Sequence, residues 1–302
     1  MSDRPAAQGG AIQHAPLHAP HRMVLGLSLL SDESGWLQVD ADRGADLREK
    51  RRLLQAQRGQ VFAELPGSRP AQEEIRGAIV GALLAHHPGA LLREGRQVEI
   101  PALDERLDLA GPLPPLELAS RLVQEDLCLM ERDAEVWRLT AASVCFPTRW
   151  DLPSKVGQSL REIHDPVPGY REGLADPTDR FFDGFRPGRI AARANWSLVD
   201  SPDLFQPLHG NRSREPVTRA DVAERVWLRV ERQTLRRFPE TGAILFTIRI
   251  HRDRLGGLAA EPARAGLLAE DLRTLPEELA RYKSIPDLRE PVLAYLDEVA
   301  AR

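Results

Sequence analysis

The sequence contains little of what several protein classes require. Its two cysteines, Cys128 and Cys145, are too few for a disulfide framework or a four-cysteine metal site. No apolar run approaches the roughly 18 to 20 residues that span a bilayer, and the first 22 residues lack the apolar core of a signal peptide. Together with the few cysteines, these absences predict a cytoplasmic protein that does not enter the membrane.

An excess of charge of one sign is also missing. The 41 basic residues face 45 acidic residues, which gives a formal net charge of −4. Such a balance provides no basic field for nucleic acid or an anionic membrane surface, so neither partner is expected. Only Lys50, Lys155 and Lys283 are lysines, and all other basic residues are arginines. Because arginine is so frequent, a cluster of arginines is weak evidence for a site in this chain.

The familiar catalytic motifs are absent as well. The chain has no GxGxxG or GxxxxGK[ST] glycine loop, no HExxH, no GxSxG and no CxxC. If the protein carries out chemistry, a bound cofactor is therefore expected to supply it.

What the sequence does contain begins with a tail and helices. Residues 1–22 are rich in Ala, Pro, Gly and His without periodicity, and are expected to form a disordered tail. Residues 46–58 and 70–87 show the apolar spacing of amphipathic helices. Five histidines lie in these parts and are interpreted as solvated tail residues or helix caps, with metal binding as the alternative: His14, His18, His21, His86 and His87.

The pattern then changes to strands. A β-hairpin is predicted over residues 127–146, and alternating or apolar runs predict three more strands, at 192–200, 226–239 and 243–251. Two strands, a helical crossing and three strands follow the chain order of a PAS-type domain, an α+β fold whose five-stranded antiparallel sheet carries a pocket under the crossing. We expect one domain over residues 23–302, with a PAS-like core at about 126–252 and helical flanks at 23–125 and 253–302.

One histidine of the crossing stands out. Pro153 is predicted to begin a helix that reaches His164, and Pro166 and Pro168 prevent that helix from continuing. His164 comes four residues after Leu160 and so lies on the same inward side. An imidazole at a rigid helix end suits metal or haem ligation, whereas the local sequence by itself favours a core histidine bonded to the backbone.

Polar residues on the predicted strands form a second candidate set. Arg193 and Asn195 share one strand face and could bind a carboxylate, or Arg193 could pair with a nearby acid. Arg229, Glu231 and Gln233 also share a face. If these three side chains are buried they need polar partners such as a ligand, and if they are exposed they need none.

Several long segments together resemble the haem subunit of the haem-dependent oxidative N-demethylase family, whose relatives include the large subunit of dimethylamine monooxygenase. The segments follow the family order over roughly residues 23 to 300. They are MVLGLSLL, WLQVD, LREKRRLL, SVCFPTRWDLPSKVGQSLREIHDPVPGY, RANWSL, LRVERQTLRRFPETGAILFTIR and YKSIPDLREPVLAYL.

The resemblance implies a PAS-like fold that holds a b-type haem and, with oxygen, removes a methyl group from a small secondary or N-methyl amine, releasing formaldehyde. Electrons would come from NADPH through flavin and iron–sulfur partner proteins. The resemblance assigns His164 as the proximal ligand of the haem iron. On chemical grounds we expect Arg193 to bind a haem propionate, Asn195 and Lys155 to assist in cofactor binding, and Glu231 to hold the substrate ammonium. The alternatives are a non-catalytic haem or small-ligand sensor and a scaffold subunit.

Overall fold

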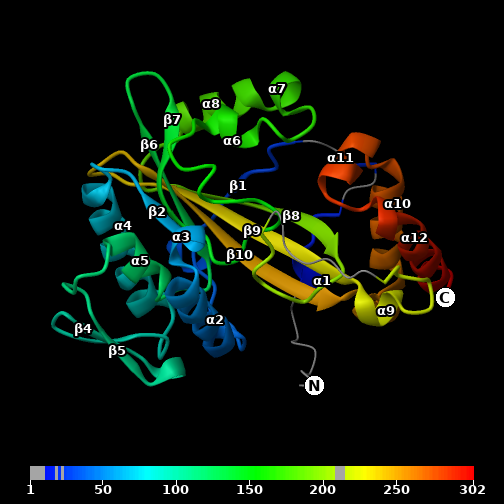
Figure 1. Ribbon diagram of the computed structural model, residues 1–302, viewed down its shortest axis with the longest axis horizontal. Coiled ribbons are helices and arrows are strands. Elements are labelled where there is room, and N and C mark those ends of the chain that lie inside the picture. Colours follow the sequence, from blue (N-terminus) through cyan, green and yellow to red (C-terminus); the bar gives the residue numbers. More distant parts are fainter. Residues whose placement is uncertain (1–10, 18–19, 22–23, 208–214) are drawn as a thin grey trace.

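The computed structural model describes residues 11–17, 20–21, 24–207 and 215–302. Its main feature is an antiparallel sheet of seven strands in the spatial order β1-β8-β9-β10-β6-β7-β2 (Figure 1). The strands are β1 (Ser28–Leu29), β2 (Phe62–Glu64), β6 (Asp126–Arg132), β7 (Trp137–Ser143), β8 (Ile190–Val199), β9 (Trp227–Arg237) and β10 (Ile244–Arg254). The predicted α+β fold is confirmed, but the sheet holds seven strands rather than five because β1 and β2 pair with its edge strands β8 and β7.

The hairpins form where the sequence places turn residues. In the β6–β7 turn, the Asp133 carboxylate accepts hydrogen bonds from the backbone N–H groups of Glu135 and Val136. In the β9–β10 turn, Gly242 adopts a left-handed conformation with a φ of 73°, and Phe238 bonds to Ala243 across the turn. The predicted hairpins at 127–146 and 226–251 are therefore confirmed.

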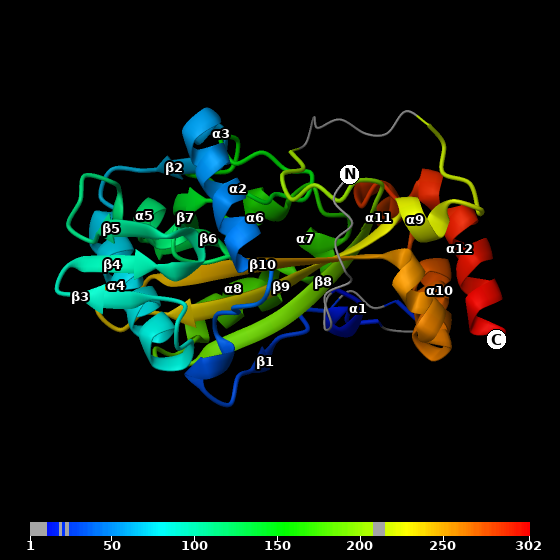
Figure 2. The same ribbon diagram turned by 90° about the horizontal axis from the view of Figure 1, so that it is seen from below.

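Helices surround the sheet in three groups. The first group, α2 to α5, packs on one face, and the crossing helices α6 to α8 cover part of the opposite face, while α10 to α12 lie at the far end (Figures 1 and 2). Their bounds are α2 (Arg43–Ala56), α3 (Arg58–Val61), α4 (Arg69–His86), α5 (Pro115–Ser120), α6 (Leu160–His164), α7 (Tyr170–Gly173), α8 (Ala175–Gly184), α9 (Val222–Arg225), α10 (Pro262–Thr274), α11 (Glu277–Tyr282) and α12 (Pro286–Ala300), with 3-10 turns η1 (Glu33–Gly35), η2 (Pro101–Leu103) and η3 (Leu255–Ala260). No helix in the described part of the chain is long and apolar enough to cross a membrane.

A second, small sheet was not predicted. It joins β3 (Leu92–Glu94), β4 (Gln97–Ile100) and β5 (Glu105–Asp108) in this order. Only β4 buries side chains fully, at Val98 and Ile100, while β3 is exposed and β5 is mostly half-buried, and both carry charged residues. Such strands lack the apolar alternation on which the sequence prediction depends.

The N-terminal segment differs in part from the expected tail. Residues 1–10, 18–19 and 22–23, and with them His18, lie outside the described residues. Residues Ala11–His14 form the short helix α1, whose Ile12 is buried against the C-terminal helices. The Ile12 N–H donates to Asp253 at 3.0 Å, and His21 Nδ1 lies 2.7 Å from the Asp271 carboxylate. The expectation of disorder therefore does not hold at residues 11–14, while the single-domain boundary at 23–302 stays a prediction.

Two buried cations fix the start of the crossing. Arg229 of β9 is 1% exposed and donates five hydrogen bonds to groups around residues 146–148 and 203–204. Lys50 of α2 is fully buried and lies 3.8 Å from the Asp126 carboxylate. That carboxylate accepts the backbone N–H groups of Cys145 and Phe146, both at 2.8 Å. The chain therefore leaves β7 along a path that charged hydrogen bonds determine.

Candidate functional site

His164 lies at the last position of α6, the first of the crossing helices. Ser159 begins this helix with a capping box: its side chain accepts the Glu162 N–H, and the Glu162 carboxylate accepts the Ser159 N–H. The helix does not begin at Pro153 as predicted. Residues 153–157 form turns, and Gly157 has a φ of 86° and bonds to Leu139 of β7, which separates this stretch from α6.

The ring of His164 is oriented by the backbone. Its Nδ1 lies 2.8 Å from the Leu160 carbonyl oxygen, so Nδ1 carries the proton and donates it. In the described part of the chain Nε2 has no hydrogen-bond partner, and its lone pair is therefore available to a ligand. Tyr170 stacks on the ring with centroids 4.8 Å apart and fixes its plane. Backbone bonding and an open Nε2 thus occur together, although the sequence presented a bonded core histidine and a ligand as alternatives.

Two cations lie close to this imidazole. Burial lowers the pKa of His164, and the charges of Arg193 and Lys155 lower it further, while the bond to Leu160 opposes them. The ring is therefore neutral near physiological pH, as a metal ligand must be. Lys155 donates from Nζ to the Ile163 carbonyl oxygen at 3.1 Å, which holds the ammonium beside α6.

Arg193 faces this site from the central strands. The β8–β9 register places Arg193 opposite Gln233, on the sheet face where Ala191 and Leu235 pack against the crossing. The Arg193 Nε is buried without a hydrogen-bond partner, and its guanidinium is in no ion pair within the described ranges. The acid nearest in effect is Glu231, which raises the pKa of Arg193 against the lowering by burial without forming an ion pair with it in the described residues.

Asn195 and Glu231 lie next along the same face. The register places them directly opposite each other, and Glu231 accepts a hydrogen bond from Gln233 Nε2 at 2.9 Å. Asn195 Oδ1 accepts a hydrogen bond from Lys283 Nζ at 2.9 Å, which leaves the amide NH2 group as the donor that a clamp with Arg193 on a carboxylate would use. That clamp stays a prediction. Of the second predicted set, Arg229 belongs to the core, and Glu231 and Gln233 are half-buried at the site.

Lys283 was missed by the sequence reasoning. It follows α11, donates to the Trp196 carbonyl oxygen and Asn195, and lies 5.0 Å from the centre of the Trp196 ring. Burial lowers its pKa to about 8, and the Glu231 carboxylate opposes this shift. A signal was available: only three of the 41 basic residues are lysines, and two of the three, Lys155 and Lys283, lie at this site.

The donor set fits a group that combines a metal with carboxylates. The free Nε2 of His164 could bind iron, and Arg193 with Lys155 would suit two carboxylate side chains of the same group. A bare metal ion fits less well, since the described residues hold no group of three or more His, Cys, Asp or Glu side chains around a point. Neither cysteine provides a thiolate, because burial raises the pKa of Cys128 and raises that of Cys145 to about 12.

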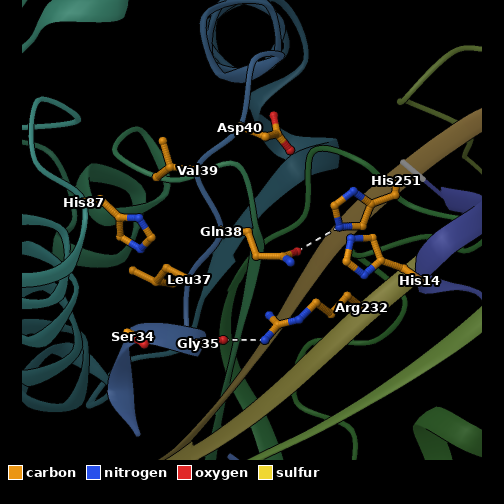
Figure 3. A pocket seen from close by; sticks show the side chains of 10 residues that line it. All are labelled: His14, Ser34, Gly35, Leu37, Gln38, Val39, Asp40, His87, Arg232 and His251. Atoms are coloured by element: carbon orange, nitrogen blue, oxygen red, sulfur yellow. Dashed lines mark hydrogen bonds between the residues drawn. The ribbon is translucent and has the colours of Figure 1, made fainter. Parts of the chain in front are cut away.

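Two cavities lie elsewhere. One, of about 330 Å³, is on the opposite face of the sheet and is lined by His14, Ser34, Gly35, Leu37, Gln38, Val39, Asp40, His87, Arg232 and His251 (Figure 3). The other, of about 500 Å³, is lined by Ala45, Asp46, Glu49, Arg52, Asp203, Leu204, Phe205 and Arg252. Neither contains a side chain from the predicted site set.

One protein-family model matches most of the chain. The model described as haem-dependent oxidative N-demethylase, alpha subunit-like matches residues 28–293. The match includes both flanks of the main sheet, the crossing with His164, and Lys283 with α11.

Proposed function

Because the chain belongs to the haem-dependent oxidative N-demethylase, alpha subunit-like family, we propose that it is the haem-binding subunit of an enzyme that oxidatively demethylates a small secondary or N-methyl amine. The observation that carries the proposal is the geometry of His164. Its Nδ1 is fixed by Leu160 and its Nε2 is open, beside two cations that suit propionates. When bound, haem b would supply the activation of O2 for oxidation of the N-methyl group.

The protein residues have separate tasks in this proposal. His164 holds the iron through Nε2, and Arg193 with Lys155 neutralises the propionates. Glu231 offers its carboxylate to the ammonium of the amine, which positions the methyl group at the reacting face. Asn195 holds Lys283, whose ammonium interacts with the Glu231 carboxylate. The crossing helices keep bulk water from this side of the sheet.

The fold assignment forms part of the proposal. The hairpin β6–β7, the crossing α6 to α8 and the strands β8 to β10 occur in this chain order, and all five strands lie in one antiparallel sheet. This order supports a PAS-like core with β1 and β2 added at the edges. Since the chain carries no nucleotide or iron–sulfur motif, we propose that NADPH, flavin and an iron–sulfur cluster reside on partner proteins that deliver electrons.

The test is turnover with a supplied electron donor. Purified protein loaded with haem would receive a reductase system, oxygen and dimethylamine or related N-methyl amines, and formaldehyde would be measured. We expect formaldehyde that depends on amine, oxygen and haem together. If the protein binds haem and the reductase reduces it, but no amine-dependent formaldehyde forms, the result would support the alternative of a non-catalytic haem sensor. If the protein takes up no haem, the alternative of a scaffold subunit would be supported instead.

A further inference from the structure

The cavity of about 330 Å³ lies on the sheet face opposite His164. Arg232 and His251 contribute to it from β9 and β10, and successive strand residues point to opposite faces, so Arg232 and Glu231 are on different sides. Figure 3 shows His14 and His251 together on one side of the cavity and His87 across from them. The proposed demethylation uses none of these residues.

Arg232 presents a guanidinium to this cavity that forms no ion pair with the described residues. It is half-buried, and its Nη1 and Nη2 donate to the carbonyl oxygens of Trp36 and Gly35. These carbonyls fix the guanidinium but do not cancel its charge, and no carboxylate pairs with Arg232 in the part of the chain that the structure describes. A guanidinium has five N–H donors, so donors remain for a ligand.

Asp40, the acidic residue that lines the cavity, already has hydrogen-bond partners. Asp40 accepts hydrogen bonds from Arg249 Nη2 at 2.6 Å, Gln124 Nε2 at 2.9 Å and the Asp42 N–H at 2.9 Å. Arg249 also lies 3.2 Å from the Asp46 carboxylate. Asp40 is therefore not an ion-pair partner of Arg232. Glu125, whose Oε1 accepts the Gln38 N–H at 2.8 Å, raises the pKa of Arg232 against the lowering by burial but forms no ion pair with it in the described residues.

The two stacked imidazoles respond to this charge. The rings of His14 and His251 lie 4.3 Å apart with 24° between their planes, and His251 Nε2 is 2.8 Å from Gln38 Oε1. Burial lowers the pKa of His251 to about 3, assisted by Arg249, His14 and Arg232, and opposed by Asp40.

His14 experiences the same field. Burial, Arg232 and Arg249 lower its pKa, while Asp253 and Asp40 oppose them. Across the cavity, burial also lowers the pKa of His87. The cavity therefore holds neutral imidazoles beside a fixed cation, which is an environment that a bound anion would stabilise.

We propose that this cavity binds a small carboxylate anion, with Arg232 as its ion-pair partner and with uptake of a proton by the His14–His251 pair. A cavity of this size accepts a small molecule. Helix α1 places His14 over it, and Arg264 of α10 holds that helix by donating to the Ile12 carbonyl oxygen. The binding site is independent of the haem site and of amine turnover.

The experiment uses the full chain, with acetate as the probe and acetamide as its neutral counterpart. Acetate should bind saturably, while acetamide should bind at least about tenfold more weakly because it cannot form the ion pair. The ring signals of His14 and His251 in NMR should move toward the protonated form as acetate binds. Acetate affinity should rise by about fivefold or more from pH 8 to pH 6, since the anion raises the pKa of the pair.

Matched variants locate the binding. Arg232→Met should weaken acetate binding at least about tenfold. His21→Gln removes a nearby histidine that pairs with Asp271 outside the cavity, and it should leave acetate binding unchanged. Equal binding of acetate and acetamide, or acetate binding that leaves the His14 and His251 signals in place, would overturn the proposal. The wild-type measurement decides this even if Arg232→Met folds poorly.

Discussion

Removing the Arg229 guanidinium should be among the most destabilising single changes in this protein. Arg229 donates from Nε to Thr148 Oγ1 at 3.0 Å, and from its two Nη atoms to carbonyl oxygens in both segments that it joins. Those oxygens belong to Phe146 at 2.8 Å, Pro147 at 3.3 Å, Asp203 at 3.1 Å and Leu204 at 2.9 Å.

The expected magnitude follows from burial. Methionine in place of Arg229 keeps most of the aliphatic volume but leaves several carbonyl oxygens buried without donors, and each such group costs about 1–3 kcal/mol. These costs are not additive, so we expect a loss of about 3–5 kcal/mol of unfolding free energy. That is a large part of the roughly 5–15 kcal/mol typical of a whole domain.

Urea unfolding, followed by tryptophan fluorescence and far-UV circular dichroism, measures this loss. Arg254→Met is the matched control, since Arg254 lies exposed at the end of β10, where it pairs with Glu224 and lies 5.4 Å from the centre of the Trp227 ring, and a surface pair of this kind is worth about 0–1 kcal/mol. Arg229→Lys keeps the charge but not the planar guanidinium, so its loss of unfolding free energy should lie between those of the two methionine variants. If Arg229→Met and Arg254→Met lose the same stability within about 1 kcal/mol, the reasoning from buried carbonyls is refuted.

Three further predictions concern Lys50, Lys283 and the proposed amine site. Lys50→Met should cost about 3–5 kcal/mol in urea unfolding because it leaves the Asp126 carboxylate buried without its cation, and a loss below about 1 kcal/mol would contradict this. Because the folded-state pKa of Lys283, about 8, lies below its usual value, the folded state disfavours its charge. Wild-type stability should therefore rise between about pH 8 and 10.5 relative to Lys283→Met, and equal pH profiles would contradict this. Glu231→Gln should raise the KM for the amine about tenfold or more with haem content unchanged, and an unchanged KM would remove Glu231 from the amine site.

The sequence was informative where the structure depends on local pattern. The alternation of Val226, Leu228 and Val230 predicted the strand that became β9, and the turn around Gly242 predicted its hairpin partner. The helix from Pro153 to His164 was wrong because Gly157 bonds to Leu139 of β7, a contact between distant segments that periodicity does not reveal.

The candidate site also combines features that the local sequence indicates with features that depend on the fold. His164 was identified from prolines and spacing within one segment, but the openness of its Nε2 and its cationic neighbours depend on the folded arrangement. Lys283 donates a hydrogen bond to Asn195, which is 88 positions away in the chain, so no local sequence pattern predicts this contact. The Asn195 amide oxygen also has a tertiary partner that the sequence did not reveal, while the predicted Arg193–Asn195 clamp would use the amide nitrogen and stays a prediction. Tertiary hydrogen bonds, rather than propensity, decide which polar side chains face a ligand.

The central claim is that His164 Nε2 binds the haem iron, and absorption spectroscopy tests it most directly. Wild-type protein expressed with ample haem should show a Soret band that shifts on reduction with carbon monoxide. His164→Gly should lose haem or change its spectrum, and added imidazole should restore the wild-type spectrum, while His86→Gly, an exposed histidine at the end of α4, should not differ from wild type. A His164→Gly protein with wild-type haem content and an unchanged spectrum would contradict the claim.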